Sequence, residues 1–567
     1  MSCSVFPKSR SFTENSKPPK RVPIASFCLT FAVFGCASQP PSTSGQAGSG
    51  ASAGVSQSTG GSSSGNSAGG GGGNPAGGAA GIPAGGSTEA GGNANPGAGR
   101  GGDLGGAGSG GAEIASGGSA AGSAGNPDPV SLPAFVTSAA NAYWNTAGQV
   151  TRPTSGTADL SIDENTKYQR WDGFGGCFNE MGWDALSVLS SEIPMAMKLL
   201  FDAKDGANFA YGRLPLGASD YSTSWYTLDD AGGDYAMEKF SIERDRQKLI
   251  PFVKAALQAK PDLHLWASPW VVPAWMMDSS RNMKNDAQTL TAHALYMARF
   301  VEEYAKEGMK IEAIHPQNEP GYARVHWTQA ELIDFIKTYL GPTLAERNLN
   351  TEIWCGTMSK DPEDTNIAKA AANDAAAMKY IKGFGVQWNL QSAVATLAAK
   401  GPVMQTEHRC GNYNFSSPYW DQTRYDSKKA QNDHLYGEES WQLIRDWIVS
   451  GVNSYSAWNM VLDTVGMSLD NWPQNALLVV DRSSKTLTVT AAYYAFRHYS
   501  QYVAPGATRI GVSGSKDALA FKNPDGSIIT EVYNGTGSPK TLTVALGSAL
   551  YKFDVPGHGW ATLRMTH

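Results

Sequence analysis

Cysteine is scarce in this chain, and its placement leaves little room for disulfide chemistry. Six cysteines occur in 567 residues, and three of them lie near the N-terminus, before the first stretch of globular composition. Cys177, Cys355 and Cys410 remain, which allows at most one internal bridge and excludes a disulfide framework. Whether two of these three pair is left open. The spacings CxxC and HExxH are also missing, so we expect no metal site.

An excess of positive charge is missing too. The 45 Lys and Arg residues are balanced by 51 Asp and Glu, for a net charge of -6, and no basic patch predicts a nucleic-acid partner. The short glycine-rich motif from Gly173 to Gly176 lacks the spacing of either nucleotide fingerprint. It indicates tight backbone packing at a first strand, and we expect no cofactor.

Glycine, by contrast, is abundant and unevenly placed. Of the 64 glycines, many crowd the region from about residue 42 to 125, together with Ser, Ala, Thr, Asn and Pro. Such a composition buries too little apolar surface to offset the loss of chain entropy on folding. We therefore predict a disordered Gly/Ser/Ala-rich spacer over residues 37–130.

A targeting segment is predicted over residues 1–36. The basic stretch from Lys17 to Arg21 precedes a short apolar run from Val22 to Gly35, as in a secretory signal, and the run is short for a membrane-spanning helix. Cys36 follows Gly35 as in a bacterial lipoprotein cleavage box, where the cysteine is lipidated; a plain signal peptide cut near Ala37 is the alternative. We expect an exported protein, either an outer-membrane or cell-surface lipoprotein or a secreted one.

Globular composition begins at about Ser131. Short apolar segments there alternate with helix-like stretches, a pattern typical of a (β/α)8 TIM barrel, which we predict over residues 166–498. An open doubly wound sheet is the alternative. The eight predicted strand segments are Trp171–Asn179, Tyr211–Asp220, Leu263–Trp270, Ile311–Glu319, Glu352–Ser359, Gly383–Asn389, Val403–Glu407 and Ser454–Leu462.

A small all-β sandwich is predicted after the barrel, over residues 499–567. Helical periodicity disappears there, and Pro524-Asp525-Gly526 and Asn534-Gly535 are expected to form hairpin turns. The extended segments at 131–165 are expected to complete this sandwich.

One helix between the fourth and fifth predicted strands has clear signals at both ends. Thr328 and Glu331 have the spacing of a capping box, and Leu332, Phe335 and Ile336 begin one apolar face. Gly341-Pro342 is expected to stop this helix.

Two carboxylates lie at strand ends that face each other across such a barrel. Glu319, followed by Pro320, is expected to end the fourth strand, and Glu407 the seventh. Retaining glycoside hydrolysis needs two carboxyl groups about 5 Å apart, one protonated and one ionised. We interpret Glu319 as the general acid/base and Glu407 as the nucleophile. The alternatives are a solvated Glu319, and a Glu407 that caps a helix or forms a salt bridge near His408 and Arg409.

Further polar and aromatic residues at strand ends suggest sugar binding. Trp270, Trp388 and Trp458 could stack on the C–H faces of a sugar ring. A single Trp usually belongs to the core, but three at the same rim favour at least one sugar platform. Asn318 could donate to a substrate hydroxyl, and Asp220 could bind two adjacent hydroxyls or close an Asx turn.

In combination, several motifs resemble glycoside hydrolase family 30, the family of glucosylceramidases and β-1,6-glucanases. The resemblance implies a (β/α)8 barrel fused to a β-sandwich, retention of configuration and no cofactor. It also implies Glu319 as acid/base, Glu407 as nucleophile, and Asp220, Trp270, Asn318 and Trp458 around the terminal glucose, with Asn475 at the rim. The motifs are Trp171-Asp172-Gly173-Phe174-Gly175-Gly176, Leu214 to Asp220, Ser268 to Trp275, Gln317-Asn318-Glu319-Pro320 and Asn471-Trp472.

The substrate is less well defined than the reaction. Gln387-Trp388-Asn389 stands where glucosylceramidases usually carry His-Trp-Tyr. This difference makes the chain more similar to the bacterial β-1,6-glucanase-like branch of the family. We expect a secreted retaining β-glucoside hydrolase acting on a β-glucan or a glucosyl lipid, with a membrane tether if Cys36 is lipidated. An endo-β-1,6-glucanase, a non-catalytic carbohydrate-binding surface protein and a structural lipoprotein are the alternatives.

Overall fold

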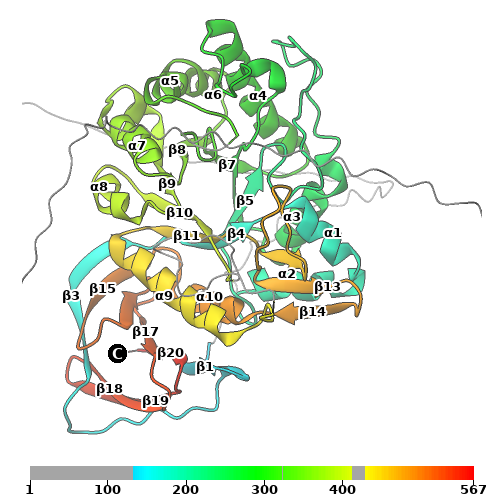
Figure 1. Ribbon diagram of the computed structural model, residues 1–567. Helices are drawn as coiled ribbons and strands as arrows, with labels where there is room; N and C mark the ends of the chain where they lie inside the picture. Colours follow the sequence, from blue (N-terminus) through cyan, green and yellow to red (C-terminus); the bar gives the residue numbers. More distant parts are fainter. Residues whose placement is uncertain (1–131, 322–323, 412–427, 567) are drawn as a thin grey trace, which may run out of the picture. The chain divides into compact units, whose positions relative to one another are not determined.

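The computed structural model describes residues 132–321, 324–411 and 428–566, so the predicted signal, Cys36 and the whole predicted spacer lie outside the described part (Figure 1). Eight parallel strands form a closed barrel in chain order, with β11 paired to β4. The predicted barrel is thus confirmed, and the open-sheet alternative is wrong. Its strands are β4 (Gly173–Cys177), β5 (Tyr211–Pro215), β6 (His264–Ser268), β7 (Ile311–Ile314), β8 (Glu352–Met358), β9 (Ile381–Val386), β10 (Val403–His408) and β11 (Ser454–Ala457).

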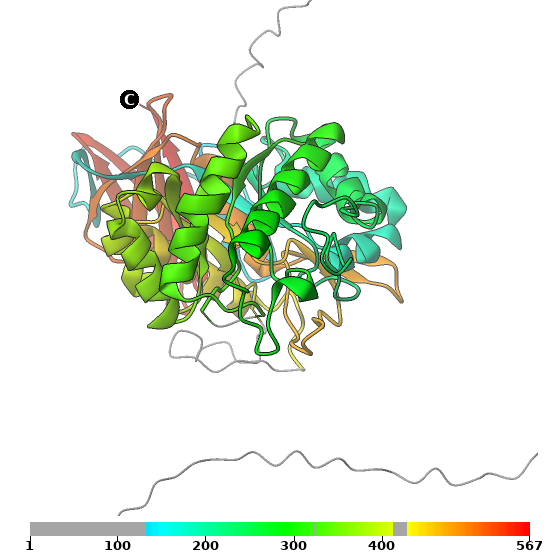
Figure 2. The same cartoon turned by 90° about the horizontal axis from the view of Figure 1, so that it is seen from above.

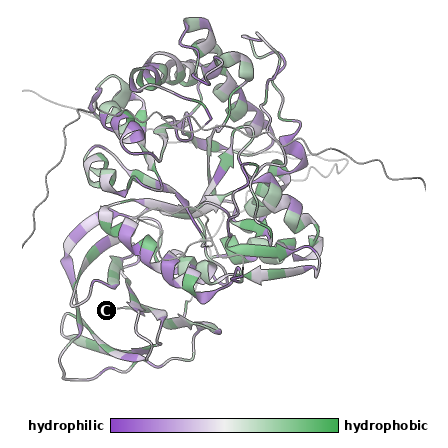
Figure 3. Ribbon diagram, in the orientation of Figure 1, coloured by the Kyte–Doolittle hydropathy of each residue, from purple (hydrophilic) through white to green (hydrophobic). Residues whose placement is uncertain are grey.

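Helices surround the barrel strands (Figure 2). On α3 (Leu249–Ala259) the side chains of Leu249, Val253 and Ala256 are buried, and each large apolar side chain so buried contributes roughly 1.5–3 kcal/mol. Figure 3 shows hydrophobic and hydrophilic bands on the helices, as expected when one face packs inward. In the described ranges no helix is long and apolar enough to cross a membrane. The other helices are α1 (Glu180–Ser187), α2 (Ile193–Phe201), α4 (Ala287–Lys306), α5 (Gln329–Asp334), α6 (Gly341–Glu346), α7 (Glu363–Asn373), α8 (Val394–Ala398), α9 (His434–Ser450) and α10 (Ala491–Tyr502).

The helix that begins at the predicted capping box does not stop where expected. Thr328 and Glu331 form the box, but a π-helical turn (Phe335–Leu340) connects α5 directly to α6, which contains Gly341 and Pro342. Gly341 donates its N–H to the carbonyl of Ile336, five residues back. The wider turn changes the hydrogen-bond register just before the proline, so the chain stays helical where a proline would normally end an α-helix.

A nine-stranded sheet, ordered β19-β18-β3-β15-β16-β17-β20-β1-β2, combines strands from before and after the barrel. The predicted turn at Pro524–Gly526 joins the antiparallel pair β16 and β17. The hairpin predicted at Asn534-Gly535 is wrong, because β17 pairs with β16 and β20 whereas β18 pairs with β19 and β3. The Asn534 amide instead donates to the carbonyls of Ser538, Val555 and Pro556. The strands are β1 (Phe135–Ala139), β2 (Ala142–Asn145), β3 (Leu160–Arg170), β15 (Thr508–Ser513), β16 (Ala518–Lys522), β17 (Ile528–Asn534), β18 (Lys540–Leu546), β19 (Ala549–Val555) and β20 (Gly559–Met565).

The last predicted barrel segment, Ser454–Leu462, spans two strands. β11 ends at Ala457, and β12 (Val461–Asp463) joins β13 (Leu478–Asp481) and β14 (Thr486–Val489) in a separate three-stranded sheet. Trp458 lies in the break between these two strands, and its backbone N–H donates to the carbonyl of His408 on β10. The break therefore places the Trp458 side chain just beyond the carboxyl ends of two neighbouring barrel strands.

Candidate active site

A buried arginine that the motifs did not identify organises the carboxyl end of the barrel. Arg213, on β5, is fully buried, and its guanidinium donates to Glu407, Asn318 and Ser268. A buried cation is tolerated only when it is paired and its N–H groups are satisfied. The sequence signal that could have identified it is one arginine inside the apolar segment Tyr211–Pro215.

Glu407 lies on β10 and is 4% exposed. Its Oε1 accepts from Arg213 Nη1 at 2.5 Å, and its Oε2 accepts from Trp388 Nε1 at 2.9 Å. Burial raises the pKa of Glu407, while the Arg213 charge, and hydrogen bonds from Arg213 and Trp388, act in the opposite direction. Both carboxylate oxygens thus face donors that favour the ionised form.

Glu319 is carried by a loop and not by the strand that we predicted. β7 ends at Ile314, because the following backbone turns toward β8, where the N–H of Glu319 donates to the carbonyl of Thr357 at 2.9 Å. Glu319 also adopts a left-handed backbone conformation, with φ of 50°. Such a conformation is uncommon outside glycine and is typical of functional sites.

The surroundings of the Glu319 side chain differ from those of Glu407. Its Oε1 accepts from Gln387 Nε2 at 3.1 Å, a neutral donor. Burial, followed by the charges of Glu407 and Asp364, raises the pKa of Glu319 to about 8. One carboxyl group therefore has a raised pKa beside a neutral donor, whereas the other is paired with a cation.

Two consecutive residues after β9 connect the carboxylates. Gln387 donates to Glu319, and its Oε1 accepts from Thr406 Oγ1 at 2.5 Å, one residue before Glu407. Trp388, with φ of 50°, donates to Glu407. Gln387 and Trp388 thus link the surroundings of Glu319 with those of Glu407.

Asn318 is buried beside the same arginine. Its Oδ1 accepts from Arg213 Nη2 at 2.8 Å and from Thr357 Oγ1 at 2.6 Å. These two bonds fix the side-chain amide so that its Nδ2 is the group left to donate to a ligand.

Trp270 and Trp458 stack on each other with ring centroids 5.2 Å apart, and the Arg213 guanidinium lies 4.2 Å from the Trp270 centroid. Both rings are largely buried. Both tryptophans therefore belong partly to the core, and they also pack against the Arg213 guanidinium that holds Glu407.

Asp220 is 8% exposed, and its Oδ1 has no hydrogen-bond partner within the described residues. Burial, followed by the charges of Glu407 and Asp470, raises the pKa of Asp220 to about 8. The structure thus leaves one buried oxygen of this carboxyl group without a hydrogen-bond partner among the described residues.

Asn475 is placed differently from the other residues. Its Nδ2 donates to the carbonyls of Cys410 and Gln431, and its Oδ1 accepts from the N–H of Ala476. Because its side-chain amide is hydrogen-bonded to these backbone groups, Asn475 connects two loop segments in this structure. It makes no hydrogen bond with the carboxylates discussed above.

Cys177, Cys355 and Cys410 are all buried free thiols, which answers the open question of a bridge. In the portions of the chain that the structure describes, no group of three or more His, Cys, Asp or Glu side chains could hold a metal ion.

Comparison with protein families gives two adjacent matches. The glycosyl hydrolase family 30 TIM-barrel domain matches residues 171–503, more than half of the chain, and the beta sandwich domain of the same family matches residues 506–563. The chain belongs to glycosyl hydrolase family 30. Glu319 and Glu407 both lie within the matched barrel domain of this glycoside hydrolase.

Relatives of this family 30 enzyme include two kinds of glycosidase. It is 25% identical to the lysosomal acid glucosylceramidase of Mus musculus over 461 residues, 74% of this chain and 87% of the relative. It is 24% identical to the endo-1,6-beta-D-glucanase neg1 of Aspergillus fumigatus over 430 residues, 69% of this chain and 84% of the relative. Its fold is similar to the crystal structure of SrfJ from Salmonella typhimurium, with a TM-score of 0.67, 23% identity, and coverage of 76% of this chain and 99% of that one.

Proposed function

We propose that this family 30 hydrolase cleaves β-linked glucose with retention of configuration. The supporting observation is the unequal environment of its two carboxyl groups. Glu407 accepts from the Arg213 cation and from Trp388, whereas Glu319 accepts from the neutral Gln387. Double displacement needs this combination of an ionised nucleophile and a protonated acid.

In the proposed first step, Glu407 attacks the anomeric carbon of the glucosyl unit. The bond to the leaving oxygen breaks as Glu319 transfers its proton to that oxygen, which leaves a covalent glucosyl–Glu407 ester. In the second step Glu319, now ionised, takes a proton from water as that water attacks the anomeric carbon and releases Glu407. Asn318 Nδ2 and the free oxygen of Asp220 are proposed to bind sugar hydroxyls.

Two substitutions test these roles. Glu407→Ala should abolish turnover, and azide should restore part of it while giving the α-glucosyl azide. Glu319→Gln should spare substrates with good leaving groups, such as dinitrophenyl glucosides, because they need least protonation. Full activity of Glu407→Ala, or equal loss of activity on all leaving groups for Glu319→Gln, would refute the assignment. Gln474→Ala serves as a control for a buried amide outside the carboxylate pair.

An endo-β-1,6-glucanase is the second candidate. It is favoured by Gln387, which stands beside Glu319 where we expect a histidine in glucosylceramidases, and by the identity to the Aspergillus fumigatus glucanase. Product analysis on pustulan and on glucosylceramide distinguishes the two candidates. Oligosaccharides released from pustulan would support endo action, and ceramide release alone would exclude it.

We also propose export of the enzyme, with the spacer holding the catalytic barrel away from a membrane in which Cys36 is lipidated. Labelling of cells with a palmitate analogue tests this, since wild type should incorporate the label and Cys36→Ser should not. Recovery of unlabelled enzyme in the medium would indicate plain secretion instead.

A further inference from the structure

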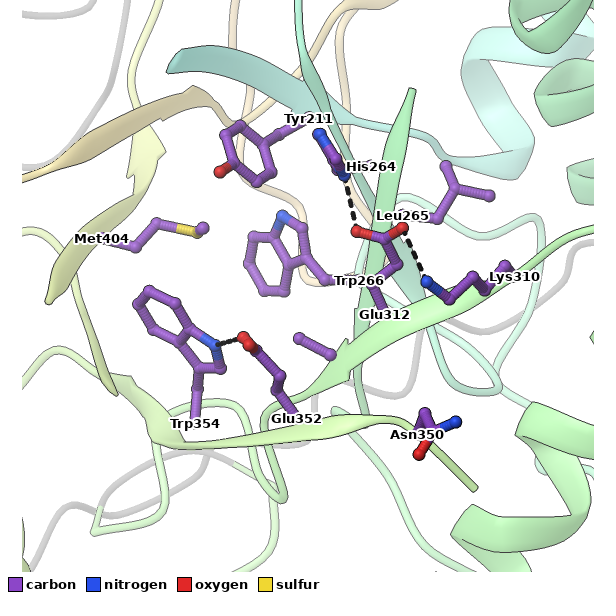
Figure 4. Close-up of a pocket in the computed structure, with 11 residues that line it drawn as sticks. Tyr211, His264, Leu265, Trp266, Lys310, Glu312, Asn350, Glu352, Trp354 and Met404 are labelled. Atoms are coloured by element: carbon purple, nitrogen blue, oxygen red, sulfur yellow. Dashed lines mark hydrogen bonds and ion pairs between the residues drawn. The ribbon is translucent and has the colours of Figure 1, made fainter. Parts of the chain in front are cut away.

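A cavity of about 270 Å³ opens at the amino ends of the barrel strands, whereas Glu319 and Glu407 lie at or beyond the carboxyl ends. Figure 4 shows the residues that line this cavity. Four of its lining residues, Tyr211, Trp266, Trp354 and Met404, lie at or near the amino ends of β5, β6, β8 and β10. The interior of a TIM barrel is normally filled by layers of side chains. A cavity of this size at the amino end therefore suggests a ligand.

The floor of this amino-end cavity is aromatic, and glycines on neighbouring strands make room for its rings. Trp266 is 2% and Trp354 8% exposed. A Cβ on Gly383 would lie 2.7 Å from the Trp354 ring, and one on Gly173 would lie 3.2 Å from the Tyr211 ring. Larger residues at these glycines would push the rings inward and reduce the cavity.

The rim of the cavity carries charges that are already paired with one another. Glu312 accepts from His264 Nδ1 at 2.6 Å and from Lys310 Nζ at 3.2 Å. Glu352 accepts from Trp354 Nε1 at 3.1 Å and lies 3.7 Å from Lys382 Nζ. Because acidic and basic groups offset each other here, the rim favours a neutral polar ligand over a small ion.

One donor beside the cavity has no acceptor. Trp266 Nε1 is buried and makes no hydrogen bond with any part of the chain that the structure describes. Figure 4 shows this nitrogen directed toward Tyr211 and His264, which also line the cavity. A buried N–H without a partner is costly, so an occupant with a hydroxyl oxygen at this point would be favoured.

We propose that the amino-end cavity binds one neutral pyranose unit. The C–H face of the sugar would pack on Trp266 and Trp354, a hydroxyl oxygen would accept from Trp266 Nε1, and other hydroxyls would donate to the carboxylates of Glu312 and Glu352. Asn350 adds an exposed amide at the rim. A free sugar and the end of a glucan chain share this chemistry.

The variants that test binding should spare Trp266, which is replaced only to assign its signal, because its ring also lies 5.0 Å from the Arg213 guanidinium that holds Glu407. The exposed rim residues Asn350 and Glu352 contact none of the proposed catalytic groups. The double variant Asn350→Ala/Glu352→Gln therefore probes the cavity while leaving catalysis on an aryl β-glucoside within about twofold of wild type. Glu346→Ala, an exposed carboxylate on α6 that does not line the cavity, is the matched control.

The test is nuclear magnetic resonance of the full chain carrying ¹⁵N-labelled tryptophan. The catalytic end is first saturated with a glucose-configured iminosugar, and D-glucose or gentiotriose is then titrated. Comparison with Trp266→Phe assigns the Trp266 indole signal, and Trp354→Phe supplies a second assignment should the first variant not fold. The Trp266 signal should shift saturably in wild type and in Glu346→Ala, with affinity roughly tenfold lower in the double variant.

The two sugars distinguish the sources of the ligand. A response to D-glucose would support a free-sugar site, and a response to gentiotriose alone would support a glucan chain end. Absence of any sugar response at either Trp266 or Trp354, or an equal response in the double variant, would overturn the proposal. A response to potassium phosphate or octanoate without a response to sugar would also overturn it, because the cavity would then select an anion or an apolar chain.

Discussion

Replacing Arg213 tests the proposed ionisation of Glu407 directly. In wild type the Arg213 Nη1 atom lies 2.5 Å from Glu407 Oε1, and both side chains are buried. The substitution Arg213→Gln keeps a hydrogen-bonding side chain but removes the charge. The pKa of Glu407, already raised by burial, should then rise further, and a larger fraction of the enzyme should carry a protonated, inactive nucleophile.

The size of the effect follows from the burial of the pair. Removing one partner of a buried ion pair costs about 3–5 kcal/mol. Each pKa unit corresponds to about 1.36 kcal/mol, so the full cost would correspond to a shift of roughly two to four units if all of it were expressed as ionisation. Some of the cost will appear as lower stability. We therefore expect the acidic limb of the pH profile to move upward by at least about one unit.

The assay is kcat/KM on an aryl β-glucoside between pH 4 and 9, where a good leaving group reduces the dependence on Glu319. Activity of Arg213→Gln should be lost most strongly at low pH and partly recovered as the pH rises, whereas Arg213→Lys should keep its acidic limb closer to that of wild type. Arg244→Gln is the matched control, because it breaks another ion pair with a buried glutamate, Glu180. A uniform loss at all pH values in Arg213→Gln, like that of the control, would refute the argument.

Three further predictions concern the neighbouring residues. Burial and the nearby charges raise the pKa of Glu319 from 4.5 to about 8. As the pH rises between these values, the unfolded chain loses this proton while the folded chain keeps it, so the contribution of Glu319 to stability falls. Glu319→Gln should therefore reduce the drop in Tm between pH 5 and 8 in calorimetry, and an unchanged drop would contradict the raised pKa. Trp388→Phe removes a donor to Glu407 and should lower kcat about tenfold or more in steady-state assays, whereas a rate equal to wild type would show that this bond is dispensable. Gly383→Ala would place a Cβ 2.6 Å from the carbonyl oxygen of Pro402 and should lower the free energy of unfolding in urea by roughly 1–3 kcal/mol. In the control Gly401→Ala the nearest atom would lie 3.2 Å from the new Cβ, so the loss of stability should be smaller.

The barrel could be predicted from sequence because each strand segment is apolar and is followed by a polar end. Glu407 could be placed for the same reason, since it lies on β10 within the predicted segment. The position of Glu319 was harder to predict, because four residues separate it from the end of β7. The backbone path of these residues is set by a contact with β8. Strand periodicity carries no information about such a contact.

Other features depended on interactions that no local pattern encodes. The π-turn before Gly341 keeps a helix continuous through Pro342, where the dipeptide by itself predicts a stop. The amide of Asn475 binds backbone carbonyls from loops 44 or more residues away in sequence. Arg213 was missed because a single arginine in an apolar strand is a weak signal until its partners are known.

Closure of the barrel is what makes the two carboxyl groups unequal. In the cyclic strand order, β5 is separated from both β10 and β8 by two intervening strands. Arg213 on β5 can therefore reach across the interior to Glu407 on β10 and to Asn318, which is bonded to Thr357 on β8. An open sheet would leave β4 and β11 as edges and would not bring this cation to Glu407. Because the cation reaches Glu407 while Glu319 contacts a neutral amide, the topology accounts for the different surroundings on which the proposed roles of nucleophile and acid rest.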